Sequence, residues 1–494
     1  MKYVHVPSEL PISEIRASEA CFSPSRYVRF IPPNISTASW FAPLDKLIVL
    51  RNSQIAINKG NWYHHAEIGD IDVTTGGVSF HKMRGYQLPD KRLLEAKNGD
   101  VLISTVRTYR KGIGIVSSDL PDLVTTKAIM NICGVTDYAP NLTLAYVYSF
   151  LRSDFFVEQV WSLLNRGVYP RMDKGALNKI KIPIASDPNV ILYVTALVQA
   201  IVEKEKTIRA RHQNILSATD CELSDNQNGS VFHYAYPSNR DIKTSSRLDT
   251  GLYCYGFRKF KHRVDSYRFG STCLSEMGIK SRRGPNLAVS VMGKSLYSDE
   301  PKPNWYQLIR PVNIGEYGTL TKQEWLGTRK KLPVSNVGDL ILGCEGFEKG
   351  RSIVLLENME RCTTNFHGTT LYSPTLDTTK IVFVRCFLAY LREHGVIDWV
   401  GVGGSGGHMS PEYFDYLPFP KFPDHKQAKI ARLYRNPVPP PAEKPTLDTF
   451  VDWHRRWNGN LGIWELDREM KDLQRALADV QEKIIEGKTV QVPL

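Results

Sequence analysis

The chain has 494 residues, of which 42% are hydrophobic and 10% aromatic, enough for two or three domains with real cores. It contains no run of about 18 apolar residues, and its N-terminus lacks the basic-then-apolar order of a signal peptide, so we expect a cytoplasmic protein without a membrane partner. The eight cysteines are scattered and form no C-x-x-C pair, which argues against a disulfide framework and a structural zinc site.

The formal net charge of +12 points to a polyanionic partner. Residues 1–188 hold 22 Lys and Arg against 17 Asp and Glu, residues 241–425 hold 24 against 19, and residues 189–222 are neutral. Two equally basic regions on a neutral segment suggest two contacts with one long polyanion. The alternative is that the charge has no such role, because many cytoplasmic proteins are mildly basic.

Residues 1–188 are predicted to form a mixed domain rich in short strands. Apolar runs at 46–50, 100–105 and 128–135 lie between Gly, Asn and Pro turns and favour strands. Residues 142–164 align apolar side chains on one face, which predicts a single helix.

Residues 189–222 predict a long central helix, of roughly 40 Å at 1.5 Å per residue. Five apolar residues recur in it at helical spacing, with no Gly or Pro between them: Val194, Leu197, Ile201, Ile208 and Ile215. Residues 223–240 are polar and predict a linker.

The second domain is predicted over residues 241–425, followed by a proline-interrupted helical connection over 426–461. Residues 462–488 predict a distal long helix whose apolar residues alternate spacings of four and three, as in a coiled-coil seam: Leu466, Met470, Leu473, Leu477, Val480 and Ile484. Each long helix follows one half of the chain, which suggests an antiparallel, coiled-coil-like spacer. The alternative is two ordinary packed helices.

The order of local patterns in the first half returns in the second after about 240 residues, as expected for an internal repeat. The matched pairs are 61–63 with 304–306, 99–103 with 338–342, 111–116 with 349–354, 125–127 with 363–365, and the Gly loop and strand before each helix. The predicted fold is therefore α+β, with two pseudo-repeated mixed α/β domains separated by long helices.

The sequence contains none of the motifs typical of nucleotide-binding, methyl-donor, serine hydrolase or zinc peptidase sites. Asp90 with Glu95-Ala96-Lys97 has a weak nuclease pattern, and this enzyme class remains an alternative. Residues 403–407, rich in Gly, could cradle a phosphate through backbone N–H groups or form a flexible loop.

Several loops combine long cations, amides and aromatics with Gly, a composition typical of DNA contacts. The first-half candidates are Arg107, Tyr109, Arg110, Lys111, Asn165, Arg166, Tyr169, Arg171 and Lys174. The second-half candidates are Arg282, Arg283, Lys349, Arg351, Asn365, His367, Ser405 and His408. The alternative for each of them is solvated surface charge.

The ordered repeat resembles the DNA specificity subunits of type I restriction-modification systems. The matching features are the strand at 99–103, the helix around 151–156, the loop at 165–167 and the strand ending in Ile182-Pro183, with counterparts from Arg247 to Ile430. Two features depart from the family pattern: 186–189 lacks the usual Glu-Gln pair, and the prolines at 436–445 separate Gln427 from the distal helix.

The resemblance implies a non-catalytic subunit of a restriction-modification or related phage-defence system. Each copy would be a target recognition domain for one half of a split double-stranded DNA site. The helices would set the gap and dock two methyltransferase subunits, which would hold S-adenosylmethionine, and a restriction or translocase subunit would be a further partner. No cofactor is expected in this chain. A solitary DNA-binding regulator is the other alternative.

Overall fold

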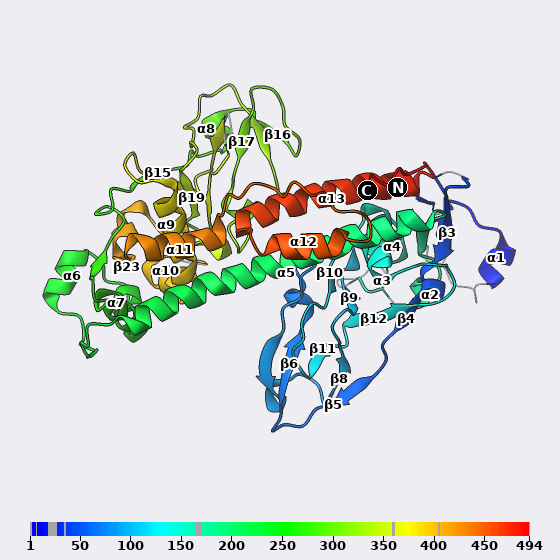
Figure 1. Ribbon diagram of the computed structural model, residues 1–494, viewed down its shortest axis with the longest axis horizontal. Helices are drawn as coiled ribbons and strands as arrows, with labels where there is room; N and C mark the ends of the chain where they lie inside the picture. Colours follow the sequence, from blue (N-terminus) through cyan, green and yellow to red (C-terminus); the bar gives the residue numbers. More distant parts are fainter. Residues whose placement is uncertain are drawn as a thin grey trace. The chain divides into compact units, whose positions relative to one another are not determined.

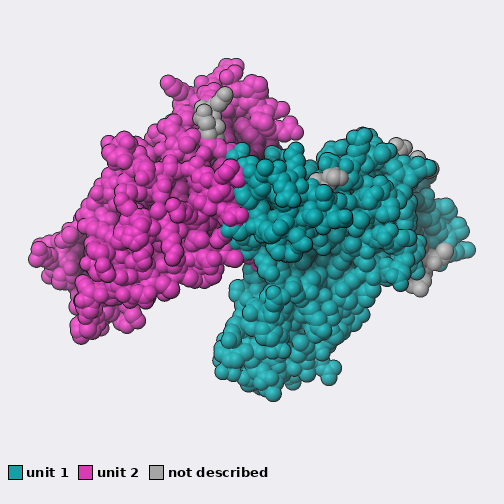
Figure 2. Space-filling view, viewed as in Figure 1, with its two compact units in different colours: residues 1–207, 440–459, 468–494 teal, residues 208–439, 460–467 magenta. Residues whose placement is uncertain are grey.

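The computed structural model describes residues 2–5, 7–17, 27–33, 36–164, 170–172, 174–357, 361–403 and 406–493. They form two compact units, coloured separately in Figure 2. Unit 1 comprises residues 1–207, 440–459 and 468–494, and unit 2 comprises residues 208–439 and 460–467. Among the described residues, no helix is both long and apolar enough to cross a membrane.

Unit 1 is mixed α/β and contains two main sheets. The first is antiparallel, in the order β10-β9-β12-β4, and consists of β4 (Ile48–Leu50), β9 (Val101–Ser104), β10 (Ile113–Ile115) and β12 (Ile129–Val135). The second has the order β5-β8-β11-β6-β7 and consists of β5 (Gln54–Ala56), β6 (Trp62–Ala66), β7 (His81–Arg84), β8 (Arg92–Glu95) and β11 (Leu123–Thr125). Strand β3 (Ser39–Pro43) pairs with β13 (Lys181–Ala185), and β1 (Val4–His5) with β2 (Arg29–Phe30). The strands predicted at 100–105 and 128–135 are confirmed as β9 and β12. The strand predicted at 46–50 is confirmed only over 48–50, as β4, because residues 46 and 47 belong to a short helix.

Unit 2 has sheets of the same kind. The antiparallel sheet, in the order β15-β22-β19-β20, consists of β15 (Lys280–Arg283), β19 (Leu340–Gly343), β20 (Ser352–Val354) and β22 (Gly368–Tyr372). The second has the order β16-β18-β17-β21 and consists of β16 (Leu296–Ser298), β17 (Tyr306–Leu308), β18 (Trp325–Gly327) and β21 (Cys362–Thr363). Strand β14 (Ser271–Thr272) pairs with β23 (Phe419–Pro420).

The antiparallel sheets of the two units match strand by strand, since β4, β9, β10 and β12 occupy the positions of β15, β19, β20 and β22. The turns that enter β9 and β19 also match in detail. Gly99 and Gly338 have φ of 88° and 91°, a region that favours glycine. In each turn an aspartate oxygen, of Asp100 or Asp339, accepts a backbone N–H from three residues upstream, at 2.9 and 2.8 Å. Both turns therefore form the same hydrogen bonds from similar local sequence.

The helix predicted over 142–164 is wrong as a single element. The structure has α3 (Leu144–Leu151) and α4 (Asp154–Leu163), because Ser153 takes extended backbone and its hydroxyl caps α4 by accepting the N–H of Phe156. In unit 2, α9 (Thr378–Glu393) and α10 (Val396–Val400) are separated by Gly395 at φ 71°. Other helices are α1 (Ile12–Ala17), α2 (Leu44–Leu47), α6 (Asn239–Ser245), α7 (Tyr255–Asp265), α8 (Val289–Met292) and α11 (Asp424–Tyr434).

Two long helices are present where the sequence predicts them: α5 (Pro188–Asp225), which begins in unit 1 and ends in unit 2, and α13 (Ile463–Ile485). The five apolar positions predicted in the central helix are all buried. Of the six in the distal helix, Leu473 and Leu477 are half-buried and the other four are buried.

Within unit 1, α5 and α13 run antiparallel (Figure 1). Tyr193 of α5 lies in the electrostatic reach of Asp479, whereas Lys204, further along α5, contacts Glu469, earlier in α13. Helix α12 (Phe450–Asn458) joins them, and their apolar faces belong to one core with α3, α4 and β13. Each long helix therefore packs its apolar face into the core of unit 1.

Candidate nucleic-acid interface

In unit 1, the first loop cluster predicted to bind DNA lies beside residues 170–172, a described part of the second cluster. The loop after β9 contains the 3₁₀ helix η4 (Thr108–Arg110). Its Arg107 N–H donates to the carbonyl of Pro170 at 2.9 Å, and the N–H of Met172 donates to the carbonyl of Thr105 at 2.8 Å. These bonds place Val106 opposite Arg171 in a β-bridge. We call segments 105–111 and 170–172 the first loop pair.

The first loop pair exposes hydrogen-bond donors. Arg110 and Arg171 are exposed, and an arginine side chain has no acceptor. The Nζ of Lys111 lies 2.6 Å from a carboxylate oxygen of Asp154, at the start of α4. Tyr109 packs edge-to-face on Trp161, with ring centroids 4.6 Å apart, so part of this aromatic ring is used for packing.

Some first-half predictions fall outside this geometry. Asn165, Arg166 and Tyr169 lie outside the described residues, as does the side chain of Lys174. Arg107 is half-buried and has φ of 50°. Left-handed backbone is uncommon for residues other than glycine, and such sites often hold a functional loop in shape.

Unit 2 has an equivalent arrangement after β19. Glu345 lies opposite His408 in a β-bridge, and the N–H of Met409 donates to the carbonyl of Cys344 at 2.8 Å. The N–H of Cys344 donates to the carbonyl of His367 at 2.9 Å, which adds a third segment. We call segments 344–349, 365–367 and 406–409 the second loop set. Glu345 and His408 hold the positions that Val106 and Arg171 hold in unit 1.

A carboxylate that the sequence did not single out, Glu345, gathers three of the predicted residues. Arg283 donates from Nη2 to Glu345 Oε1 at 2.9 Å, His408 Nδ1 lies 2.9 Å from the same oxygen, and His367 Nδ1 hydrogen-bonds Glu345 Oε2. The Glu345 side chain remains 26% exposed. The guanidinium of Arg283 also stacks 3.5 Å from the ring centroid of Phe366, so this cation is held on two sides.

This cluster borders a cleft of about 630 Å³, within the size range of clefts that take small organic groups. Its lining includes Arg310, Glu345, Glu348, Asn365, His367 and His408. The Oδ1 of Asn365 is buried without a hydrogen-bond partner, although buried acceptors are normally paired. Arg310 donates from Nε and Nη2 to both carboxylate oxygens of Glu324, at 2.7 and 3.0 Å.

Two predicted DNA contacts, Lys349 and Arg351, also make contacts inside unit 2. Lys349 is only 6% exposed, and its Nζ donates to the carbonyl of Gly406 and lies 3.0 Å from Asp398. Arg351 is half-buried and donates to the carbonyl of Ile314 at 3.2 Å. The buried Lys349 does not fit a surface phosphate contact, whereas Arg351 stays a prediction.

The remaining second-half predictions are less constrained. Arg282 donates to the carbonyl of Val334 at 2.7 Å and is half-buried. Ser405 lies outside the described residues. The Gly-rich loop that contains it is closed by reciprocal backbone hydrogen bonds between Val402 and His408 at 2.8 and 2.7 Å.

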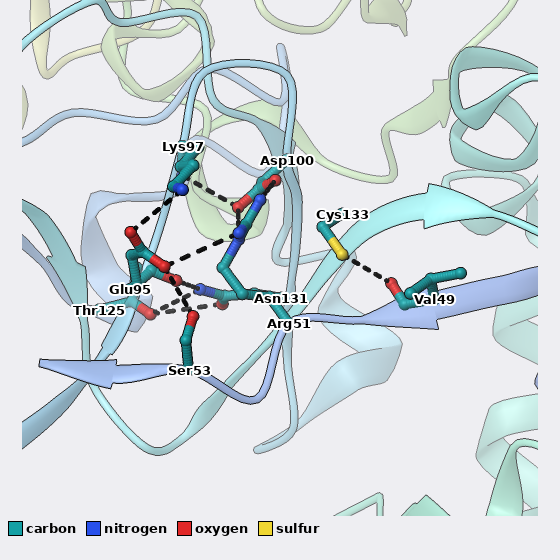
Figure 3. A network of polar contacts seen from close by, with 9 residues as sticks. All are labelled: Val49, Arg51, Ser53, Glu95, Lys97, Asp100, Thr125, Asn131 and Cys133. Atoms are coloured by element: carbon teal, nitrogen blue, oxygen red, sulfur yellow. Dashed lines mark hydrogen bonds and ion pairs between the residues drawn. The ribbon is translucent and has the colours of Figure 1, made fainter.

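The weak nuclease pattern is not assembled as a site. The carboxylate of Asp90 pairs with Lys127, whereas Glu95 accepts from Ser53 at 2.6 Å and pairs with Arg51 and Lys97 (Figure 3). These contacts, led by the Ser53 hydrogen bond, hold the pKa of Glu95 below its usual range. Arg51 is itself held by both oxygens of the buried Asp100. The network ties strand β8 to the turn before β9 and gives no support to a catalytic centre at these residues.

Other chemistry finds little support in the part of the chain that the structure describes. There, no group of three or more His, Cys, Asp and Glu could hold a metal ion. Burial raises the pKa of the Cys344 and Cys362 thiols to about 12 and that of Cys386 to about 11, so these three remain protonated thiols rather than nucleophilic thiolates.

No protein-family model and no curated protein matches this sequence. Similar solved chains include one from a structure of complex assembly and conformational transition of the type I R-M system, at 16% identity and TM-score 0.32, covering 92% of this chain and 100% of that one. The HsdS subunit from Thermoanaerobacter tengcongensis is similar at 16% identity and TM-score 0.32, covering 92% and 98%. The S subunit of the type I restriction-modification system of M. genitalium is similar at 12% identity and TM-score 0.41, covering 93% and 99%. All three come from type I restriction-modification systems, the kind of system that the sequence motifs resemble.

Proposed function

We propose that this chain is a non-catalytic, sequence-specific DNA-binding subunit of a cytoplasmic type I restriction-modification or related phage-defence complex. Unit 1 reads one half of a split site through the first loop pair, and unit 2 reads the other half through the second loop set. The observation that carries the proposal is the equivalence of these loops. One follows β9 and the other follows β19, which hold the same place in matching sheets. Each bridges to a segment that precedes a later strand, β13 in unit 1 and β23 in unit 2.

Sequence and charge support the same proposal. The ordered motifs and the equal basic charge of residues 1–188 and 241–425 fit a duplicated DNA-reading domain. Arginine forks and amides are the side chains that most often contact phosphates and base edges. The antiparallel packing of α5 on α13 within unit 1 is suited to a rigid spacer, which we propose sets the gap between the half-sites.

The chemistry belongs to partners in this proposal. Two methyltransferase subunits dock on the long helices and hold S-adenosylmethionine, and a restriction or translocase subunit joins them. The proposal is tested by co-purification of the full chain with a candidate methyltransferase, followed by sequencing of methylated bases in cells that express both. We expect methylation at one split sequence, lost when either protein is omitted. A purified chain that binds no methyltransferase yet recognises one DNA sequence would favour the solitary regulator instead.

A further inference from the structure

The equivalent loops of the two units carry opposite hydrogen-bonding groups. In the first loop pair, the bridge position opposite Val106 holds Arg171, and Arg110 is exposed nearby; both are donors only. In the second loop set, His408 takes the position of Arg171, and Glu345 takes that of Val106. The frame is shared, but the groups that it presents are not.

The cluster around Glu345 leaves acceptors facing outward. A carboxylate has about four lone-pair sites, and the described hydrogen bonds of Glu345 use two of them, from Arg283 and His367, while His408 Nδ1 lies 2.9 Å away without a hydrogen bond. His367 hydrogen-bonds the carboxylate through Nδ1. A neutral imidazole that donates from Nδ1 presents Nε2 as an acceptor.

The cleft beside this cluster is also rich in acceptors. Asn365 contributes a buried Oδ1 without a partner, and Glu348 contributes a second carboxylate to the lining. Arg310, a cation of the lining, already donates to both oxygens of Glu324. A phosphate would meet two carboxylates here, which are acceptors like itself, whereas an N–H donor would find several partners.

DNA bases differ in whether their edges present hydrogen-bond donors or acceptors. In the major groove, adenine N6 and cytosine N4 present amino donors, whereas guanine and thymine present acceptor oxygens at the corresponding place, and Glu and Asn are the usual partners of cytosine and adenine. We infer that Glu345 and Asn365 determine specificity in unit 2 by selecting a base with an exocyclic amine, adenine or cytosine, in its half-site. This inference rests on the proposed function and adds the chemistry of one recognised base.

The test is a binding selection from a random duplex pool with the full chain, its Glu345→Gln and Asn365→Ala variants, and an Arg110→Ala/Arg171→Ala variant that marks the half-site of unit 1. The substitution Glu393→Gln, an exposed carboxylate at the end of α9, matches the charge change away from the cleft. Melting temperatures are measured for all variants. Free adenosine and cytidine are titrated in a parallel arm, because the same amine could come from an unattached nucleoside.

The half-site that the arginine variant leaves unchanged is the one assigned to unit 2. We expect the wild type to require adenine or cytosine at one position of that half-site. Glu345→Gln and Asn365→Ala should weaken that preference roughly five- to a hundredfold, the range for one base contact, and Glu393→Gln should not. If the wild type selects a split site but both cleft variants keep every preference, or lose only melting temperature, the cluster is structural and the inference is wrong. The same holds if the relaxed base is guanine or thymine, or if Glu345→Gln affects only nucleoside binding. A wild type that selects no sequence would refute the proposed function itself.

Discussion

A buried lysine in unit 1 offers a sharp test of how the long helices are held together. The Lys204 side chain of α5 is fully buried, and its Nζ donates to Asn458 Oδ1 at 2.8 Å and to Glu469 Oε2 at 2.5 Å. The other oxygen of Glu469 accepts the indole N–H of Trp457 at 2.7 Å. One ion pair therefore connects α5, α12 and α13.

Replacement of Glu469 by Gln should leave the lysine charge buried without its counter-charge. Breaking such a pair by removing one partner typically costs about 3–5 kcal/mol, because the other charge stays buried without compensation. Lys204→Met removes the buried charge itself and leaves Glu469, whose side chain is 33% exposed and keeps its hydrogen bond from Trp457. It should therefore cost less, about 1–3 kcal/mol for the hydrogen bonds that Asn458 and Glu469 lose. For a unit of this size, the Glu469→Gln loss corresponds to a fall in melting temperature of roughly 6–20 °C.

Urea unfolding and calorimetry of wild type, both single variants and the double variant measure these differences, with exposed Glu482→Gln as the control. The double variant should be closer to Lys204→Met than to the sum of the two losses, because the charges act as a pair. If Glu469→Gln is no more destabilising than Lys204→Met, an unpaired buried charge is not what sets the stability here and the reasoning is refuted.

The same pair predicts a pH dependence. Burial lowers the pKa of Lys204, and Glu469 opposes this shift. Between the lowered pKa and the ordinary value of 10.5, the unfolded chain binds more protons than the folded chain, so this group makes the free energy of unfolding rise with pH. Removal of Glu469 lowers the pKa further. The difference between wild type and Glu469→Gln should therefore shrink as pH rises towards 10, and a constant difference would contradict this.

Three further predictions concern other parts of the chain. Burial, with two nearby arginines, lowers the pKa of His212 from 6.5 to about 3. As pH falls, the unfolded chain therefore takes up this proton before the folded chain does. The wild type should lose more stability than His212→Asn when urea unfolding is measured at pH 5 instead of pH 7. Leu473→Pro should destabilise α13 by about 3 kcal/mol or more and abolish methylation of the split site in the complex, while Leu473→Ala keeps the helix; undiminished methylation by the proline variant would contradict the spacer. Lys349→Ala should lower stability by about 1–3 kcal/mol, because the internal contacts of its ammonium group are removed. Arg110→Ala with Arg171→Ala should keep the melting temperature and flatten the salt dependence of DNA binding by roughly one unit for each phosphate that is no longer neutralised. A stable Lys349 variant with a flattened salt dependence, beside an unstable arginine variant, would contradict the burial argument.

Periodicity and punctuation in the sequence predict much of this fold. Apolar spacing locates α5 and α13 and their buried positions, because helical packing demands that spacing whatever the partner surface is. The break between α3 and α4 was missed because the apolar pattern continues across it. Ser153 followed by Asp154 was nevertheless a usable signal, since serine is a preferred N-cap and acidic residues are enriched in the first turn of a helix.

The candidate site was harder to predict. Glu345 was missed because its partners, Arg283, His367 and His408, come from three distant segments that only sheet register brings together. Lys349 was misassigned because composition alone does not distinguish a buried cation from an exposed one. The repeat offered a signal, since Lys111 and Lys349 pair with Asp154 of α4 and Asp398 of α10. Each of these helices is the second α-helix after its lysine, and a cation that recurs with its counter-ion indicates a structural role.

The central claim is that the two units read separate halves of one split DNA site. Its most direct test is to exchange residues 1–188 for the same region of a relative with a different specificity and to sequence the methylated bases made by the complex. The account predicts that one half of the recognised sequence changes while the other half and the gap stay as they were. A change in both halves, or in neither, would contradict it.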